Sequence, residues 1–416
     1  MYSTPPPLRA ESFEPPVGLR RLQAPALVTG LVGLAIAAVG FFVDRAHFYQ
    51  AWLTGWVLWL SVALGCLGLL MLHHMTHGAW GLMIRRPLEA ASRTLPLLLV
   101  LFVPVVLGMH DLYHWTHEDV VRADRFLTAK EPYLNTPFFL VRAALYFAIW
   151  LLFAWQLDRL SRRQDEASDA RTYQRLQAWS AAGFLILAIT GSFAAIDWLM
   201  SLDPHWFSSL YGLWFFAGMG LSGLAFSIVV AGWLSRRDPM RAVIRPRHFH
   251  DYGKLFFAFV MLWAYLSFSQ YLLMWAGNLP EEIPFYLRRV QGPWAVISVF
   301  LLFSHFVLPF LVLLSADVKQ RGPLLVKVAI WMLAMRWLDY FWNVAPTLQA
   351  LHAADGGGHG QSPWLMIWID LAAAVGLGGI FVWYFLRQLA SRSLLPVGDP
   401  FLAEAVARDE AQASHA

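Results

Sequence analysis

The sequence contains a single cysteine, Cys66, among its 416 residues. A disulfide framework, a thiolate-held iron–sulfur cluster, a zinc ribbon and a CxxCH haem attachment each need two or more cysteines. All four are therefore excluded for this chain. Any redox-active metal would depend on histidine or carboxylate ligands, or would belong to another protein.

Charged residues are also scarce. They make up 14% of this chain, whereas hydrophobic residues make up 58%. An average soluble domain carries about 25% charged residues, so a soluble protein of this composition would lack the polar groups to cover its surface. The excess apolar side chains are expected to face lipid. A water-soluble enzyme, a disordered scaffold and a nucleic-acid-binding module are excluded.

Ten windows of the sequence are apolar over the roughly 20 residues that a helix needs to cross a bilayer. They cover residues 24–43, 50–72, 95–115, 138–158, 176–200, 206–233, 254–277, 294–315, 324–344 and 364–386. The sequence therefore predicts an all-α integral membrane protein of about ten transmembrane helices. The membrane domain is expected over 23–390, between an N-terminal arm (1–22) and a C-terminal tail (391–416).

Basic residues alternate between the two sides of the predicted spans. Of the 31 lysines and arginines, 22 lie in the N-terminal segment, every second loop and the C-terminal segment, with Lys254 at the edge of the seventh window counted in the loop before it. Six lie in the alternate loops and three lie within spans. Because cytoplasmic loops are enriched in lysine and arginine, we expect both termini to be cytoplasmic.

A first set of ionisable residues lies toward the periplasmic ends of the third to fifth predicted spans. It comprises His110, Asp111, His114, Arg142 and Asp197. Ionisable side chains within spans by default mark ligands, partners or proton pathways, and imidazole titrates near neutrality. The set is a candidate contact for a quinone head group. The alternative is a hydrogen-bonded cluster that only satisfies helix ends.

A second set of polar residues lies in the later spans and in the turn that follows the fifth span. It comprises Asp203, His205, Tyr265, Gln270, His305, Arg336, Asp339 and Asp370. Arg336 and Asp339 are three residues apart, so they share a helix face and are expected to pair. This set is a candidate proton path, and a structural ion pair is the alternative. The sequence predicts no catalytic residue and no metal ligand.

Three histidines, His73, His74 and His77, have the spacing of a ligand set. They fall at the cytoplasmic end of the second predicted span, close to Arg85 and Arg86. Contact with lipid head groups or a surface position is the expected role of this group.

Two longer stretches carry a resemblance to a known family. They are FAAIDWLMSLDPHWFSSLYGLWFFAG (193–218) and FHDYGKLFFAFVMLWAYLSFSQYLLMWAGNLPEE (249–282). Over nearly its whole length the chain resembles the second polysulfide-reductase-like (NrfD-like) membrane subunit of alternative complex III. That complex is a bacterial quinol:cytochrome c (or other electron acceptor) oxidoreductase.

The resemblance implies two four-helix bundles in the bacterial inner membrane, about 50–200 and about 206–344, flanked by helices 24–43 and 364–386. It implies no covalently bound or metal-ligated cofactor, with contact to quinone or menaquinone as a candidate. The implied partners are the sister NrfD-like subunit, an iron–sulfur protein, multihaem and monohaem cytochromes c, small membrane subunits and lipid, but no nucleic acid. In the family the quinol pocket belongs to the sister subunit, and this subunit is proposed to carry a proton path.

Two other classes of protein stay open. The first is a subunit that only docks partners and lipid. The second is a secondary transporter, in which helices interrupted by glycine or proline typically occur in both halves. Pro309 lies in the middle of the eighth predicted span, and no paired break is expected in the other half. The sequence therefore favours a subunit of a redox complex over a transporter.

Overall fold

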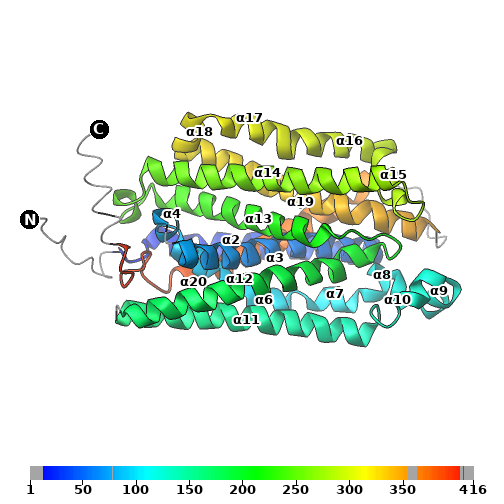
Figure 1. Cartoon of the computed structure of the whole chain (residues 1–416), viewed down its shortest axis with the longest axis horizontal. Helices are drawn as coiled ribbons and strands as arrows, with labels where there is room; N and C mark the ends of the chain where they lie inside the picture. The colour runs from blue at the N-terminus through cyan, green and yellow to red at the C-terminus, as the bar shows by residue number, and fades with distance from the viewer. Residues whose placement is uncertain (1–12, 77, 168, 355–362, 403–405, 407–416) are drawn as a thin grey trace, which may run out of the picture.

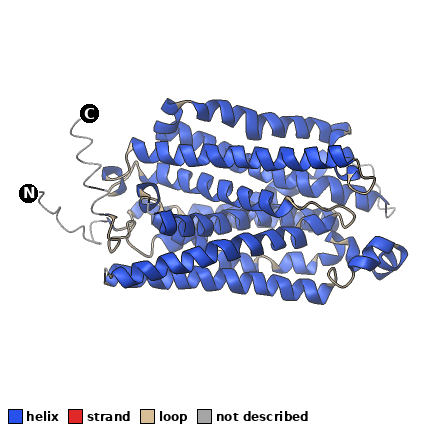
Figure 2. Ribbon diagram, viewed as in Figure 1, coloured by secondary structure: helices blue, strands red, loops and turns tan. Residues whose placement is uncertain are grey.

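The computed structural model describes residues 13–76, 78–167, 169–354, 363–402 and 406 (Figure 1). Within these residues the regular elements are all helices (Figure 2). Nine helical segments of the described chain are long and apolar enough to cross a membrane. The chain is thus an all-helical protein with the features of a multi-pass membrane protein.

The nine segments are built from one or several helices each. They are Val17–Val43 (α1, Val17–Arg21; α2, Gln23–Val43), Arg45–Thr76 (α3), Arg85–Leu107 (α5, Arg85–Ser92; α6, Leu95–Val100; α7, Val103–Leu107), Thr136–Glu166 (α11), Ala170–Leu202 (α12, Ala170–Trp198; η3, Met200–Leu202), Tyr211–Leu234 (α13), Pro246–Gly277 (α14), Gly292–Leu314 (α16, Gly292–Leu301; η5, Leu302–Val307; α17, Leu308–Leu314) and Ile367–Leu389 (α20).

The other helices connect these segments or flank them. They are α4 (Ala79–Leu82), α8 (Met109–Leu112), η2 (His114–Thr116), α9 (Glu118–Ala123), α10 (Arg125–Lys130), η4 (Met240–Ala242), α15 (Ile283–Val290), α18 (Ala316–Gln320), α19 (Gly322–Ala354) and η6 (Pro363–Met366).

The ninth predicted span, 324–344, lies within α19, which is not among the nine segments. This helix has 33 residues, which is enough to span a bilayer, but Lys327, Arg336 and Asp339 interrupt its apolar sequence. It packs against α13 and α3 inside the helical bundle. The count of ten spans and the cytoplasmic position of both termini stay predictions.

The third predicted span, 95–115, corresponds to the segment Arg85–Leu107, so its bounds are shifted toward the N-terminus. The segment begins at Arg85, ends at Leu107 and is divided by turns at 93–94 and 101–102. Pro96 and Pro104 lie near the start of α6 and α7. Because proline lacks an N–H and its ring crowds the preceding turn, a regular helix cannot run through both positions.

Two indoles bond carbonyl groups that this broken segment leaves free. The N–H of Phe102 bonds the carbonyl of Leu99 rather than that of Leu98. Trp56 donates its Nε1–H to the Leu98 carbonyl at 2.9 Å, and Trp52 likewise bonds Leu101 at 2.9 Å. The breaks are therefore stabilised by side chains of α3, as buried carbonyl groups require.

The sixth span begins later than predicted. It was expected at residue 206, but α13 begins at Tyr211. Trp206 instead lies in the preceding loop, where its ring stacks on Phe285 of α15 with the centroids 3.9 Å apart. This contact fixes the loop after α12 onto α15.

Helix α3 forms the centre of the bundle and packs against α5, α12, α13, α19 and α20. Figure 1 shows α11 and α12 along one long edge and α14, α16 and α17 along the other, with α3 and α13 between them. Helices α2 and α20 pack closely against each other, and α20 also lies on α3. The boundaries of two separate four-helix bundles stay a prediction.

The bundle has two ends, which we call the α4 end and the α9 end after the short helices that lie there. The α4 end carries α4 (Figure 1) and, next along the chain, the start of α5. There the N–H of Leu394 bonds the carbonyl of Phe13 at 2.8 Å. The α9 end carries α8, α9, α10 and α15 (Figure 1). The predicted orientation would place the α4 end in the cytoplasm.

Candidate functional site

A buried cluster at the α9 end joins α11 and α12. We call it the Asp197 cluster; it consists of Asp197, Arg142, Tyr133 and Tyr146. Asp197 is fully buried and Arg142 is 7% exposed. The guanidinium binds the carboxylate through two hydrogen bonds, Nε to Oδ2 at 2.8 Å and Nη2 to Oδ1 at 3.0 Å. The two phenols donate to the same carboxylate, Tyr133 to Oδ1 at 2.9 Å and Tyr146 to Oδ2 at 2.7 Å.

Local structure holds these groups in place. The side chain of Asn135 accepts a hydrogen bond from the N–H of Phe138 and thereby caps α11. Arg142 donates to the carbonyl of Tyr133 at 2.9 Å and lies 3.9 Å from the centre of its ring. Burial and the charge of Asp197 raise the pKa of Tyr133 to about 12, so its hydroxyl stays a donor at neutral pH.

The carboxylate of Asp197 is saturated. An ionised carboxylate has about four acceptor positions, and four donors occupy them here. Removing one partner of such a buried ion pair is costly, because the other charge is left buried and unpaired. A ligand oxygen that needs Arg142 would have to displace one of these contacts.

The other three residues of the first predicted set lie on α8 and η2. Asp111 pairs with Arg45 at 2.8 Å. His110 is exposed and its ring lies 3.9 Å from that of His117. His114 lies in η2, at the start of the loop to α9. The structure therefore brings Arg142 and Asp197 into contact, and gives Asp111 and His110 other partners.

A second buried cluster lies near the middle of the bundle. We call it the Asp339 cluster; it consists of Asp339, Arg336, Trp263 and His305. Arg336 and Asp339 form an ion pair along α19. Trp263 of α14 donates its indole N–H to Oδ2 of Asp339 at 2.9 Å. The same indole stacks on His305, with the ring centroids 3.7 Å apart and an interplanar angle of 29°.

This second cluster is buried but incompletely bonded. His305 and Arg336 are fully buried and Asp339 is 2% exposed. Within the described residues, the two ring nitrogens of His305 and Nη2 of Arg336 make no hydrogen bond of regular geometry, although the guanidinium of Arg336 interacts with the hydroxyl of Tyr340. Most buried polar groups in proteins are bonded, so this cluster is less completely bonded than the carboxylate of Asp197.

The chain makes room for this cluster in two ways. Gly218 faces Arg336, and a Cβ there would lie 2.3 Å from Nη2. The π-helical turn η5 contains His305 and precedes Pro309, which has no N–H to bond the carbonyl of Ser304. Trp331 bonds that carbonyl instead, at 2.8 Å. Insertions of this kind in helices often occur at functional sites.

The remaining residues of the second predicted set lie at other places. Tyr265 is 65% exposed on the outer face of α14. Gln270 is buried and donates to the hydroxyl of Tyr286 at 3.2 Å. Asp370 of α20 pairs with His47 of α3 at 2.6 Å. The set is thus not one connected chain of side chains.

Asp203 and His205 lie in the loop after α12 and bind neighbouring segments. Asp203 pairs with Arg288 of α15 at 2.6 Å, and His205 pairs with Asp124 at 2.5 Å. Burial would raise the pKa of Asp124, but the hydrogen bond with His205 and two backbone N–H donors outweigh it and lower the pKa. Asp203 and Asp124 therefore hold the loop after α12 against neighbouring segments at the α9 end.

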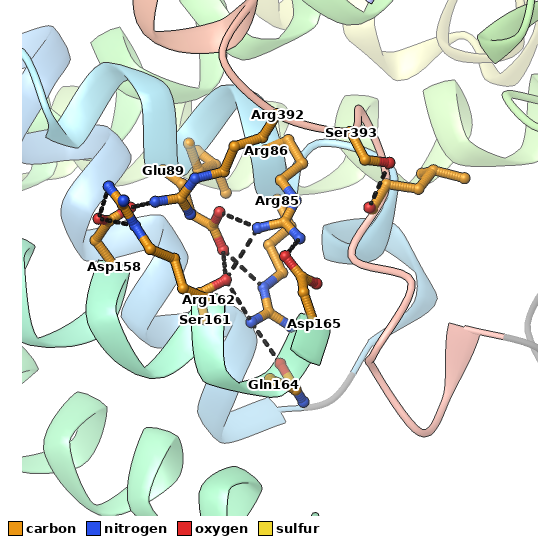
Figure 3. Close-up of polar contacts among 12 residues, drawn as sticks. Arg85, Arg86, Glu89, Asp158, Ser161, Arg162, Gln164, Asp165, Arg392 and Ser393 are labelled. Carbon is orange, nitrogen blue, oxygen red and sulfur yellow. Dashed lines mark hydrogen bonds and ion pairs between the residues drawn. The ribbon is translucent and has the colours of Figure 1, made fainter. Parts of the chain in front are cut away.

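Sequence reasoning missed a network at the α4 end. Figure 3 shows side chains of α5, α11 and the C-terminal segment meeting there. Glu89 binds Arg85 at 3.0 Å, Arg86 at 2.6 Å and Ser161 at 2.7 Å. Arg85 also pairs with Asp399 at 2.6 Å. The arginines three and four residues before Glu89 are the signal that predicts such pairing.

The expected surface position is wrong for His73 and His74, and the neighbouring arginines are buried as well. Arg85 is fully buried, and Arg86, His73 and His74 are each 3% exposed. His74 hydrogen-bonds Ser180 at 2.8 Å. His77 lies outside the described residues. Carboxylates from other segments explain the burial, because a buried guanidinium is tolerated when it is paired.

Neither a protein-family model nor a curated protein matches this chain. The likeness to NrfD-like subunits therefore stays a prediction. In the part of the chain that the structure describes, no three histidine, cysteine or acidic side chains are grouped as a metal site requires.

The two clusters differ in what they can do chemically. The Asp197 cluster has no acceptor position left on its carboxylate, so it is suited to holding α11 and α12 together. The Asp339 cluster has an imidazole and a guanidinium with unused polar atoms beside a carboxylate. The imidazole nitrogen and the carboxylate can accept a proton, and the free N–H groups of the guanidinium can donate hydrogen bonds to water.

Proposed function

We propose that this chain is the NrfD-like membrane subunit of a bacterial quinol:acceptor oxidoreductase of the alternative complex III type. In this proposal, iron–sulfur and haem subunits carry the electrons in the inner membrane. This chain supports quinol oxidation and conducts protons through the Asp339 cluster. The stretches 193–218 and 249–282 support the family, and the described helices support a membrane protein.

The observation that carries the proton-conducting role is the incomplete hydrogen bonding around Asp339. Leaving a buried polar group unsatisfied costs about 1–3 kcal/mol. A cluster that only stabilised the bundle would be expected to bond all three of these atoms, the two ring nitrogens of His305 and Nη2 of Arg336. Buried ionisable groups that line a wet interior are typical of proton relays in membrane proteins.

A direct contact with quinone was predicted for the first set of residues, which includes Arg142, Asp197 and His110. Arg142 and Asp197 bind each other and two phenols, so we propose that they position α11 and α12. Quinol turnover and inhibitor binding after Asp197→Asn and after His110→Ala test direct contact. Lower inhibitor affinity in an assembled Asp197→Asn complex would favour contact, and unchanged turnover and affinity in both variants would exclude it.

The family assignment is tested by purification of the tagged full-length chain from native membranes under mild detergent. We expect multihaem and monohaem c-type cytochromes and an iron–sulfur protein to co-purify in fixed ratio, with quinol:acceptor activity. A chain that purifies without haem proteins would contradict the proposal.

A secondary transporter is the second candidate, because both halves of the chain contain an interrupted helix. The first half has the breaks between α5, α6 and α7, and the second half has η5. Paired interruptions of this kind occur in transporters. Purification without redox partners would favour this class, and intact assembly with unchanged proton stoichiometry in cluster variants would favour a scaffold.

A further inference from the structure

A cleft of about 500 Å³ lies between the last turns of α14 and the short helix α15. Its lining is mainly aromatic and aliphatic and includes Tyr271, Met274, Trp275, Tyr286 and Leu287. Cavities that bind small molecules typically have about 300–1,000 Å³ and a mostly apolar lining. The cleft is therefore large enough for a ring of two or three substituents and the start of a tail.

The mouth of the cleft continues into an apolar outer surface. Trp275 is 71% exposed, and Leu272 and Leu273, its neighbours on α14, are 48% and 56% exposed. In a membrane protein such side chains face lipid or another subunit. A ligand with a long apolar tail would thus enter from the bilayer and leave its tail there.

The polar groups at the cleft are neutral. Tyr286 contributes a hydroxyl and Asn278 an amide to the lining. Behind Tyr286, the buried amide of Gln270 uses Nε2 to bond that hydroxyl, and its Oε1 has no partner within the described residues. Turning the amide over would exchange the two atoms. With Nε2 donating to the phenol oxygen, the O–H of Tyr286 is left to donate to a ligand. With the amide turned over, that O–H would bond Oε1, and Nε2 would be the group with unused donors.

The cations beside the cleft are already engaged. Arg288 pairs with Asp203 at 2.6 Å. Arg289 donates to the carbonyl groups of Phe285 and Asn343, both at 2.7 Å. Burial lowers the pKa of Arg289 to about 9, so it is still charged at neutral pH. A phosphate head group prefers arginine or lysine contacts. Arg288 and Arg289 are bound to other groups, so the cleft favours a neutral ligand.

We propose that this cleft binds the head group of an isoprenoid quinone, a flat neutral ring with carbonyl oxygens, between Tyr286 and Trp275. The proposal deepens the proposed function and rests on it, because it names the quinone site of this chain. It places that site in the second half of the chain, away from the Asp197 cluster. Carbonyl oxygens accept from Tyr286 and from an amide N–H, and the aromatic side chains contact the ring faces.

The position of the cleft relates it to the Asp339 cluster. Gln270 and Trp263 are seven residues apart on α14 and both are buried. Two helical turns separate them, which is about 10 Å along the axis. The same face of α14 therefore connects the back of the cleft to the indole that bonds Asp339. Protons released at the cleft would have buried polar groups within this distance.

The test is photolabelling of the purified full-length chain in detergent with a short-tailed azidoquinone, followed by peptide mapping. We expect labelling within 271–290 that excess decylubiquinone displaces and short-chain phosphatidylglycerol does not. Leu287→Trp fills the cleft at a half-exposed position and should abolish this labelling. Tyr286→Phe removes one hydrogen bond and should weaken quinone competition about fivefold.

Tyr265→Phe is the matched control, because it removes a phenol from the outer face of the same helix. It should leave labelling and competition unchanged. Labelling elsewhere, displacement by phosphatidylglycerol alone, or unaltered labelling of a folded Leu287→Trp chain would overturn the site. If that variant does not fold, mapping and competition on the natural sequence decide. The assay needs no partner subunit, so its failure is distinct from a failure of co-purification.

Discussion

Two buried arginine–aspartate pairs in this molecule have similar composition and different surroundings. Arg142 and Asp197 join two helices, and the carboxylate receives four hydrogen bonds. Arg336 and Asp339 lie on one helix, and Nη2 of the arginine makes no hydrogen bond of regular geometry within the described chain. The residue types alone would assign both pairs the same role. The two pairs differ in how completely they are hydrogen-bonded. On this ground we treat Arg142 and Asp197 as a structural pair that holds two helices together, called the clamp below, and the Asp339 cluster as a group that can bind a proton.

The largest expected effect is on stability, at the Asp197 cluster. Arg142→Leu leaves a buried carboxylate without its cation, which costs about 3–5 kcal/mol. We expect a large loss of thermal stability in detergent, measured by the unfolding midpoint. Arg45→Leu is the control, because Arg45 forms an exposed pair with Asp111 and exposed pairs contribute about 0–1 kcal/mol. Equal losses in the two variants would remove the distinction between clamp and surface pair.

The next effect is on function, at the Asp339 cluster. His305→Phe keeps an aromatic ring against Trp263 and removes two unsatisfied nitrogens. We expect stability to stay the same or to rise, because no hydrogen bond of the described structure is lost. Loss of a proton-transferring side chain lowers rates about a hundredfold. Proton translocation coupled to quinol oxidation should fall accordingly in vesicles.

The outcome that would contradict this prediction is unchanged proton translocation per electron in an assembled His305→Phe complex. A strong loss of stability without loss of translocation would also contradict it. In both cases the Asp339 cluster would be a structural element like the Asp197 cluster.

A smaller effect is expected from single phenols of the clamp. Tyr146→Phe removes one of the four donors to Asp197, which should reduce the free energy of unfolding by about 1–2 kcal/mol. Turnover of the assembled complex should not change, because the ion pair with Arg142 remains. Reduced turnover at full stability would assign Tyr146 a chemical role and would make the two clusters alike.

The smallest effect is a pH dependence at the α9 end. His205 and backbone N–H groups hold the pKa of Asp124 below its ordinary value. The stabilisation is therefore complete above the ordinary aspartate pKa of about 3.9 and is lost as the pH falls through the lower folded-state value. Asp124→Asn should remove this acid-sensitive part, which for a partly exposed pair is below about 1 kcal/mol. Identical acid unfolding curves for both proteins would contradict the assignment.

The sequence was sufficient for the coarse fold and for two pairs of residues. Apolar windows predicted the helices, because hydrophobic length is a local property. The three-residue spacing predicted the pairing of Arg336 with Asp339, and their positions in spans drew attention to Arg142 and Asp197. The breaks in the third span follow from Pro96 and Pro104, which a search for apolar windows does not weigh. The indoles of α3 that bond the freed carbonyl groups could not be read from the sequence.

Other features depend on contacts between segments far apart in the chain. Tyr133 and Tyr146 saturate Asp197, and no spacing rule links either of them to it. Arg85 is buried because Asp399, more than 300 residues later, pairs with it. The stacking of Trp263 on His305 likewise joins α14 to η5. Such tertiary partners decide whether a buried charge is paired and hydrogen-bonded. They cannot be predicted from the spacing of residues in a single sequence.

We expect Asp339, and not Asp197, to exchange a proton during turnover. Infrared difference spectroscopy of the assembled complex, with and without quinol, measures this directly. The spectrum should contain a deuterium-sensitive band of a protonated carboxyl group that disappears in Asp339→Asn and persists in Asp197→Asn. A band that persists in Asp339→Asn, or that disappears only in Asp197→Asn, would contradict this expectation.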